Sequence, residues 1–250
     1  MRWLKRLWSS SPIDQPRSDD VLAEAEAALP FLRYLTPESL VRLRQMATTF
    51  LARKEFAGAA GLEITAFMQA SIALQACLPV LELGLEAYDG WVGIVVYPGE
   101  FVIPRREIDE DGVLHEYTED ALGEAWDGGP VVLAWLDDPD EYEGANVVVH
   151  EFAHKLDMLN GDADGLPPLH AGMSVEAWDA ALGAYEHFCE RVDAGEDTEI
   201  DPYASEHPAE FFAVLSEVFF VEPALLRAIY PDVYLQLAQF YRQDPLHAAK

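Results

Sequence analysis

The spacing of apolar residues divides the chain into a helical first third, a central part with strand patterns, and a helical remainder. Apolar positions at helical spacing predict helices over 18–29, 37–53 and 65–77, and we expect the helix to continue over 80–87. Thr36 is a typical N-cap, because a threonine oxygen accepts hydrogen bonds from the free amides of a first helical turn. The chain therefore begins with a helical unit.

The pattern changes after the turn at 89–90, where β-branched and aromatic residues become frequent. We expect strands over 91–97, 101–103, 113–117 and 131–135, separated by turns that contain glycine and proline. An extended substrate can pair with the free edge of such a sheet, although ordinary core packing explains the same pattern.

Helical spacing returns over 145–159, 175–194 and 208–220, and Pro223 and Pro231 each begin a further short helix. The fold class that follows is α+β, mostly helical, with a small mixed sheet beside the 145–159 helix.

We expect a flexible tail at 1–17 and a single domain over 18–250. Within that domain, 18–88 forms a helical N-terminal part, and 89–250 contributes the sheet and the helices of the candidate site.

Charge excludes one class of partner. The formal net charge is −29, from 45 acidic and 16 basic residues, so binding to nucleic-acid phosphates is not expected. No apolar run reaches the length of a membrane span, and the start of the chain lacks the apolar segment of a secretory signal. The prediction is a cytoplasmic protein. Cys77 and Cys189 stand in apolar helical stretches, and we expect both to be buried thiols.

The stretch 147–157 carries the pattern H-E-x-x-H, as His150, Glu151 and His154. On a helix the two histidines lie one turn apart on the same face, so both imidazoles can bind one zinc ion. Glu151 lies where a general base for an activated water is needed. The same pattern arises by chance in buried helices. The apolar neighbours and Asp157, which returns to the histidine face and could orient a ligand or meet substrate, favour a catalytic site.

A catalytic zinc usually has three protein ligands and one open position. The metzincin extension of the motif does not fit, because Asp157 and Asn160 stand where it requires glycine and histidine. The gluzincin arrangement, in which a later helix supplies a glutamate, leaves Glu206, Glu210 and Glu217 as candidates. Glu210 and Glu217 share one helix face, and the residues alone leave both open.

Several separate motifs occur in one order: L-P-V-L-E-L-G-L-E at 78–86, H-E-F-A-H-K-L-D at 150–157, N-G-D at 160–162, and Y-A-S-E-H-P-A-E-F-F-A-V-L-S-E-V-F-F at 203–220. Together they resemble the Mlc titration factor A (MtfA) family of bacterial zinc peptidases. The resemblance extends from about residue 20 to Q-F-Y-R-Q-D-P-L at 239–246. It implies a zincin-like fold and a gluzincin site similar to that of anthrax lethal factor.

Carried over by motif, the resemblance implies that His150, His154 and Glu210 bind one Zn²⁺ ion. The catalytic glutamate falls on Glu151. The site tyrosine falls on Tyr203, whose phenol can hydrogen-bond the oxyanion of a tetrahedral intermediate. The residues alone do not single out Tyr203.

The expected function is that of a zinc-dependent peptidase, which the resemblance suggests is aminopeptidase-like and acts on short peptides. The resemblance also implies a second role, the binding of the transcriptional repressor Mlc, which would regulate a sugar phosphotransferase system. No stretch of the sequence marks a docking surface for such a repressor. The alternative is a zinc-stabilised regulatory protein that sequesters a repressor without catalysing a reaction.

Overall fold

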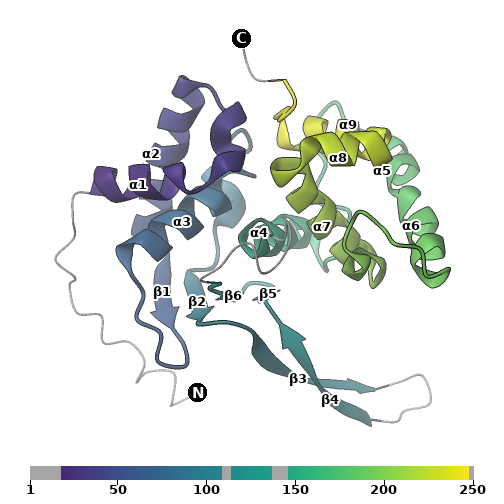
Figure 1. The fold of residues 1–250 in the computed structure, drawn as a ribbon, viewed down its shortest axis with the longest axis horizontal. Helices are drawn as coiled ribbons and strands as arrows, with labels where there is room; N and C mark the ends of the chain where they lie inside the picture. The colour runs from purple at the N-terminus through teal and green to yellow at the C-terminus, as the bar shows by residue number, and fades with distance from the viewer. Residues whose placement is uncertain (1–17, 109–113, 137–145, 248–250) are drawn as a thin grey trace.

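The structure is a computed structural model that describes residues 18–108, 114–136 and 146–247. Two groups of helices flank the central helix α4 (Val147–Asp157), and the strands lie below them (Figure 1). The fold is α+β, with a small mixed sheet beside α4, as the sequence predicted. The tail predicted at 1–17 lies outside the described residues.

The first group of helices follows the predicted boundaries closely. Thr36 accepts a hydrogen bond from the Ser39 amide at 3.0 Å, so its predicted capping role is confirmed. The continuous helix predicted over 80–87 is wrong, because Gly84 adopts a φ of 101° that no α-helix contains. The elements are α1 (Ser18–Ala27), η2 (Pro30–Tyr34), α2 (Pro37–Arg53), α3 (Ala66–Cys77) and η3 (Leu85–Tyr88).

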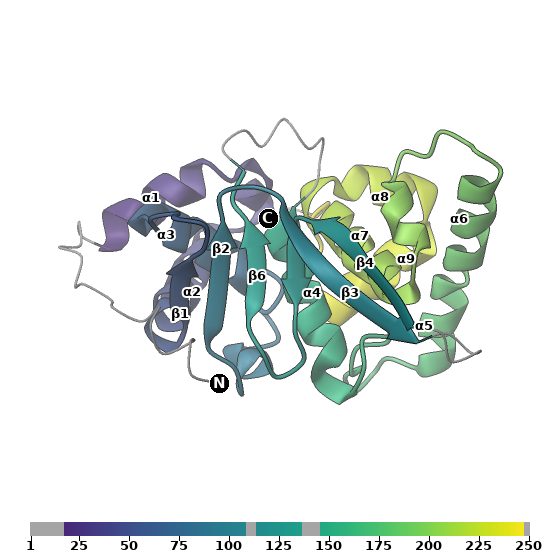
Figure 2. The same cartoon turned by 90° about the horizontal axis from the view of Figure 1, so that it is seen from below.

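The four-stranded sheet has the order β1-β2-β6-β5. Its first two pairings are parallel, and β5 runs antiparallel to β6 at the edge. In Figure 2, β1, β2 and β6 lie side by side with helices behind them. The bounds are β1 (Glu55–Gly58), β2 (Gly93–Tyr97), β5 (Gly123–Ala125) and β6 (Val131–Ala134).

Strands β3 (Phe101–Ile108) and β4 (Leu114–Ala121) form an antiparallel hairpin that projects from the body of the molecule (Figure 1). Its base packs on the second face of the sheet, where Phe101 and Ile103 contact Val132. Both strands are longer than predicted. The backbone pairing between β3 and β4 continues beyond the apolar residues into polar positions. These polar residues pair through backbone hydrogen bonds, which do not require side chains buried in a core.

The last group of helices contains one difference from the prediction. The long helix expected over 175–194 is two helices, because the chain turns at Gly183, which separates α5 from α6. Glycine is a common helix terminator. The elements are η5 (Met158–Asn160), α5 (Val175–Leu182), α6 (Ala184–Asp193), η6 (Pro202–Ser205), α7 (Pro208–Val221), α8 (Pro223–Ile229) and α9 (Pro231–Tyr241).

A single hydrophobic core joins the two groups of helices through α4. Phe152 of α4 is fully buried, and its ring centroid lies 5.7 Å from that of Phe50, 5.0 Å from that of Tyr88 and 5.8 Å from that of Trp91. Burying such a side chain contributes about 1.5–3 kcal/mol. The helix that carries the H-E-x-x-H motif is therefore held by the core on its apolar face.

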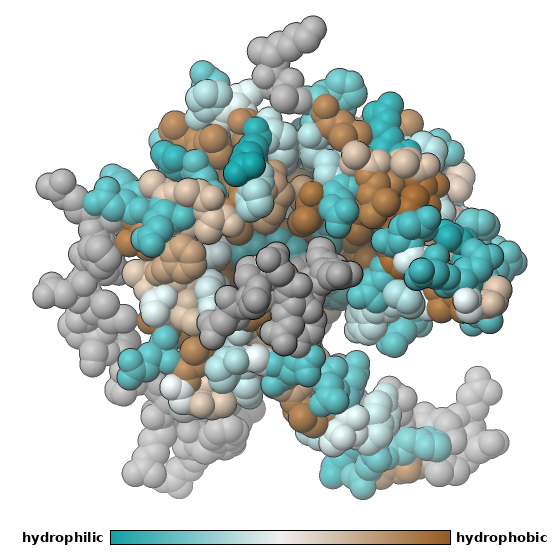
Figure 3. Space-filling model, in the orientation of Figure 1, coloured by the Kyte–Doolittle hydropathy of each residue, from teal (hydrophilic) through white to brown (hydrophobic). Residues whose placement is uncertain are grey.

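On the face drawn in Figure 3, polar side chains lie along the hairpin and over α6. None of the helices in the described ranges is both long and apolar enough to cross a membrane. Cys77 is buried as predicted, whereas Cys189 is only half-buried.

Candidate metal centre and active-site cleft

Asn146 fixes the start of α4. Its side-chain oxygen accepts a hydrogen bond from the Val149 amide at 2.9 Å, and its side-chain amide donates to Gln75 Oε1 of α3 at 2.9 Å. Its backbone amide donates to Glu217 Oε2 of α7 at 2.6 Å. The first turn of α4 is therefore tied to two other helices, and this sets the rotation of the helix about its axis.

Helix α7 presents its glutamates to α4. Its apolar residues Phe211, Phe212 and Leu215 are almost completely buried, so the helix is fixed by the core. Glu210 and Glu217 are seven residues apart, which places them on the same face two turns apart. That face packs directly against α4.

Three side-chain donor atoms converge between α4 and α7. Nε2 of His150 lies 3.0 Å from Oε2 of Glu210, and Nε2 of His154 lies 3.2 Å from the same oxygen. The two imidazole nitrogens are 3.1 Å apart. The structure thus brings together His150, His154 and Glu210, the three residues that the resemblance implied as metal ligands.

This triangle has the dimensions of a zinc site. Ligand atoms about 2.0–2.1 Å from a tetrahedral zinc ion are separated from each other by about 3.3 Å. The three observed separations, 3.0, 3.1 and 3.2 Å, are close to that edge length. Two imidazoles and one carboxylate also form the donor set of a catalytic zinc with one open position. The residues therefore fit a bound metal ion.

Glu217 contacts the other nitrogen of His150. Its Oε1 lies 2.6 Å from Nδ1 of that imidazole, while its Oε2 accepts the amide of Asn146. A carboxylate in this position fixes the tautomer and the ring orientation of a metal-binding histidine. The ambiguity between Glu210 and Glu217 is thus explained, because both glutamates hold the same imidazole from opposite sides.

The charges within the triangle stabilise one another. Burial opposes the charged form of His150, but its hydrogen bonds to Glu210 and Glu217 outweigh this and raise the pKa of His150 well above its usual value. Burial also opposes the charged form of Glu210, yet its hydrogen bonds to His150 and His154 hold its pKa well below the usual range. Glu210 is therefore an anion that requires a positive partner.

Glu151 lies beside the triangle with only 4% of its surface exposed. Its Oε2 has no hydrogen-bond partner among the described residues. Burial raises the pKa of this carboxyl to about 8, because a charged carboxylate loses its hydration there. An unpaired buried carboxyl destabilises the fold, and such groups are typical of functional sites.

Tyr203 lies at the edge of the same site, on η6. Its ring centroid is 6.1 Å from that of His150, and 38% of the residue is exposed. Burial of the phenol and the nearby Glu210 raise the pKa of Tyr203, so its hydroxyl remains protonated and can donate a hydrogen bond. Asp201 fixes the turn by accepting the Tyr203 amide at 2.9 Å.

Two other sequence candidates are not among the three donor atoms. Asp157 is completely buried and accepts a hydrogen bond from the Gly165 amide at 2.8 Å, so it does not face a substrate. It instead anchors the loop that runs beside Pro208 at the start of α7. Glu206 is exposed and is not part of the triangle of donor atoms.

The candidate site opens into a cleft of about 370 Å³ between α4, α7, the base of β4, the edge strand β5 and the loop before η6. His150, Glu151 and Tyr203 line it, whereas no lysine or arginine of the described residues does. In addition to Glu151 and Glu217, six other acidic residues line the cleft. They are Glu100, Glu119, Asp120, Glu199, Asp201 and Glu222. The cleft therefore favours positively charged groups.

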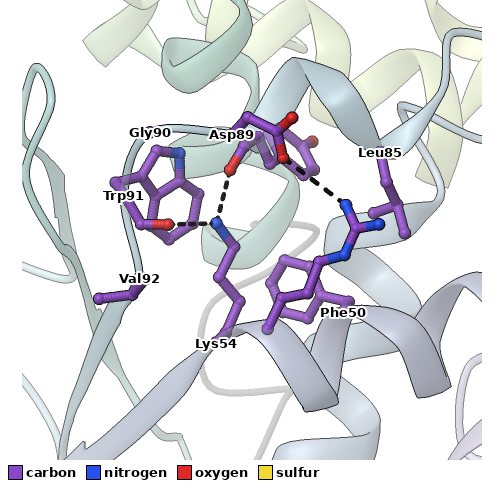
Figure 4. A pocket seen from close by; sticks show the side chains of 9 residues that line it. Phe50, Lys54, Leu85, Asp89, Gly90, Trp91 and Val92 are labelled. Carbon is purple, nitrogen blue, oxygen red and sulfur yellow. Dashed lines mark hydrogen bonds and ion pairs between the residues drawn. The ribbon is translucent and has the colours of Figure 1, made fainter.

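A second cavity, of about 250 Å³, is lined by Phe50, Lys54, Trp91 and their neighbours (Figure 4). The ammonium group of Lys54 donates hydrogen bonds to the carbonyl oxygens of Tyr88 and Trp91, both at 2.6 Å, and lies 3.4 Å from the Trp91 ring centroid. Asp89 faces Arg53 at 3.6 Å. These polar groups already have partners, so we interpret this cavity as part of the packing around Lys54.

Sequence reasoning missed the roles of Asn146 and Gly123. Asn146 directly precedes the first turn of α4, so its capping role was visible in the sequence as a favoured N-cap residue. Gly123 gave no signal, because its importance comes from the side chain of another element that lies against it.

Comparison with known proteins agrees with this geometry. The model of a family described as glucose-regulated metallo-peptidase M90 matches residues 3–242. A protein of Klebsiella pneumoniae (strain 342) named Mlc titration factor A is 41% identical over 96% of this chain and 92% of its own length. Proteins of the same name from Salmonella arizonae and Cronobacter sakazakii are 40% and 41% identical, over 97% and 89% of this chain and 98% and 86% of their own lengths. The chain belongs to the family of glucose-regulated metallopeptidases M90.

Proposed function

We propose that this protein is a zinc-dependent peptidase of the gluzincin type, with His150, His154 and Glu210 as the zinc ligands. The observation that carries the proposal is the triangle of donor atoms, 3.0–3.2 Å on each side, of which His150 lines the same cleft as Glu151. Two imidazoles from an H-E-x-x-H helix together with one carboxylate are the donor set of zinc peptidases.

The chain supplies the groups that a peptide hydrolysis needs. Zinc bound at the triangle supplies Lewis acidity, which lowers the pKa of a water molecule and polarises a scissile carbonyl group. Glu151 takes the proton from the attacking water and passes it to the leaving amine. The hydroxyl of Tyr203 donates a hydrogen bond to the oxyanion as negative charge develops. Glu217 keeps the His150 imidazole in the tautomer that leaves Nε2 free to bind the metal.

The acidic cleft supports an aminopeptidase-like activity on short peptides. A free α-amino group carries a positive charge and needs carboxylates or carbonyl groups to receive it. The walls of the cleft provide several carboxylates, of which Glu199 also pairs with Arg191 at 3.3 Å, and no lysine or arginine of the described residues lines the cleft itself. A peptide with an uncharged, blocked N-terminus lacks this attraction.

The test uses purified protein with aminoacyl p-nitroanilide substrates, with zinc content measured on the same samples. We expect about one zinc per chain, activity that a chelator abolishes, and a loss of about 10²–10⁴-fold in kcat for Glu151→Gln with zinc retained. Activity that survives both the chelator and Glu151→Gln would exclude this mechanism. Bound zinc without hydrolysis of any peptide would instead favour the zinc-stabilised, non-catalytic alternative.

A second role is favoured by the name Mlc titration factor A, which the relatives carry. We propose that the protein also binds a transcriptional repressor similar to Mlc, in the cytoplasm, and so regulates sugar phosphotransferase genes. The test is direct association between this protein and the most similar sugar-operon repressor of its host, both purified. No association at micromolar concentration, with peptidase activity intact, would leave the enzyme alone.

A further inference from the structure

Gly123 of the edge strand β5 lies directly against the side chain of Glu151. A Cβ atom at position 123 would stand 2.2 Å from Oε1 of Glu151 and 2.6 Å from both Cδ and Cγ. These are the three nearest heavy atoms, and all belong to Glu151. The volume that a side chain at position 123 would occupy is therefore already filled by the carboxyl group of Glu151.

The backbone does not explain why residue 123 is glycine. Its φ lies outside the left-handed region, so an L-residue can adopt the same conformation. Its partner in the ladder is Leu133 of β6, in an ordinary antiparallel register. The approach of Glu151 is thus the feature of this position that requires a glycine.

Glu151 cannot retreat as a whole, because its helix is fixed. Phe152 and Ala153, which follow it, are completely buried, as is Val149. A methyl group at position 123 would meet Cγ as well as the carboxyl group, so a small rotation of the carboxyl end alone does not relieve the contact. The side chain must leave the strand and change its direction relative to His150 and His154.

We propose that Gly123 is a positioning residue, which holds the general base against β5 and thereby aims its carboxyl group at the attacking water. This inference rests on the proposed peptidase function. A displacement of about 1 Å of a catalytic group commonly costs about 10²-fold in rate. The residue acts through Glu151, so replacing it changes the chemical step and leaves the three metal ligands in place.

A different effect of the same substitution is distinguishable. Gly123 also lines the cleft, so an added methyl group could crowd a bound peptide. Crowding weakens substrate binding and raises KM, whereas displacement of the base lowers kcat. Separate values of kcat and KM therefore distinguish crowding of the substrate from displacement of Glu151.

The first experiment measures unfolding of the metal-free protein and requires no activity. Gly123→Ala, Glu151→Ala and the double variant form a cycle with the wild type. We expect Gly123→Ala to lower the unfolding midpoint or to prevent folding while Glu151 is present. We expect no loss when Glu151→Ala has removed Cγ and the carboxyl group. Equal losses in both backgrounds would overturn the proposed contact.

The second experiment measures kinetics of the zinc-loaded protein. We expect Gly123→Ala to lower kcat about 10²-fold, with KM within about threefold of wild type and with zinc content unchanged. Glu151→Asp, whose side chain is one methylene shorter, should cost less activity in the Gly123→Ala background than in wild type. A kcat for Gly123→Ala within about twofold of wild type would overturn the positioning role. So would an equal loss of activity from Glu151→Asp in the wild-type and Gly123→Ala backgrounds.

Gly183→Ala is the matched control, because it makes the same chemical change at an exposed helix junction that does not line the cleft. Its activity should equal that of wild type. If wild-type protein loaded with zinc cleaves nothing, the proposed function fails, while the unfolding cycle still reports the contact. If the wild type is active and Gly123→Ala is equally active, the positioning role fails and the proposed function stands.

Discussion

Glu217 contacts His150 but supplies none of the three donor atoms of the candidate metal site. Both of its oxygens are acceptors, one for Nδ1 of His150 and the other for the Asn146 amide. In Glu217→Gln one of these oxygens becomes a donor, so one of the two contacts is lost. We expect metal affinity to fall about 10–100-fold, which competition with a zinc-binding dye would measure.

The control for that substitution is Glu176→Gln, which removes the same charge from an exposed position on α5. It should leave zinc affinity unchanged. An equal loss of affinity in both variants would show that overall charge, and not the contact with His150, controls metal binding.

Tyr203 permits a test that separates catalysis from binding. In Tyr203→Phe the ring remains 6.1 Å from that of His150, but the hydroxyl that can donate to an oxyanion is absent. We expect kcat to fall about 10²-fold, with little change in KM or zinc content. A rise in KM with kcat unchanged would instead assign the hydroxyl to substrate binding, and steady-state kinetics decide between these outcomes.

At the residue scale, the sequence predicted which site residues share one helix, but it did not predict the side-chain contacts between helices. His150, Glu151 and His154 follow from helical spacing alone. Glu210 and Glu217 could not be separated, because residues seven apart share a face, and only the packing of α7 on α4 decides which ring nitrogen each one meets. Tyr203 lies in a short turn with no periodicity, so only the family resemblance indicated it.

Lys54 shows how one side chain ties several elements together. It follows the end of α2 and donates hydrogen bonds to the carbonyl groups of Tyr88 and Trp91, which precede β2. Lys54→Met keeps most of the volume but leaves two buried acceptors unpaired. We expect the free energy of unfolding to fall by about 1–3 kcal/mol, measured by urea denaturation at pH 7.

The same residue gives a prediction about pH. Burial is the main cause that lowers the pKa of Lys54 from 10.5 to about 8 in the folded protein. Between these two values the unfolded chain holds more protons than the folded protein, so stability rises with pH. The stability of wild type relative to Lys54→Met should therefore increase from pH 8 to pH 10.5. A constant or shrinking difference in urea midpoints over this range would contradict the buried ammonium group.

At the scale of elements, prediction succeeded where local signals are strong. α2 and α7 begin at prolines that follow a capping residue, and both were predicted close to their observed starts. β1 and β5 were missed, because they have four and three residues and become strands only through their partners. β5 matters most, since it brings Gly123 to Glu151, and three residues carry no periodic pattern.

At the scale of the whole molecule, the net charge of −29 and the acidic cleft act in the same direction. A charge of this size was visible in the sequence, but its concentration around the candidate site was not. The carboxylates of the cleft come from the loop before β3, from β4, from the loop before η6 and from the end of α7. Only the folded chain brings them together, so composition alone could not predict that the acidic residues gather around the candidate site.

That preference should depend on salt. Salt screens the attraction between the cleft and a cationic substrate, and the screening length falls from about 10 Å at 0.1 M ionic strength to about 3 Å at 1 M. Lys-p-nitroanilide carries one more positive charge than Leu-p-nitroanilide, so it gains more from the field of the cleft. We expect the ratio of their kcat/KM values, lysine over leucine, to fall as ionic strength rises from 0.05 M to 0.5 M. Because the ratio cancels effects of salt on the enzyme itself, a ratio that stays constant would mean that the acidic walls do not act on the substrate.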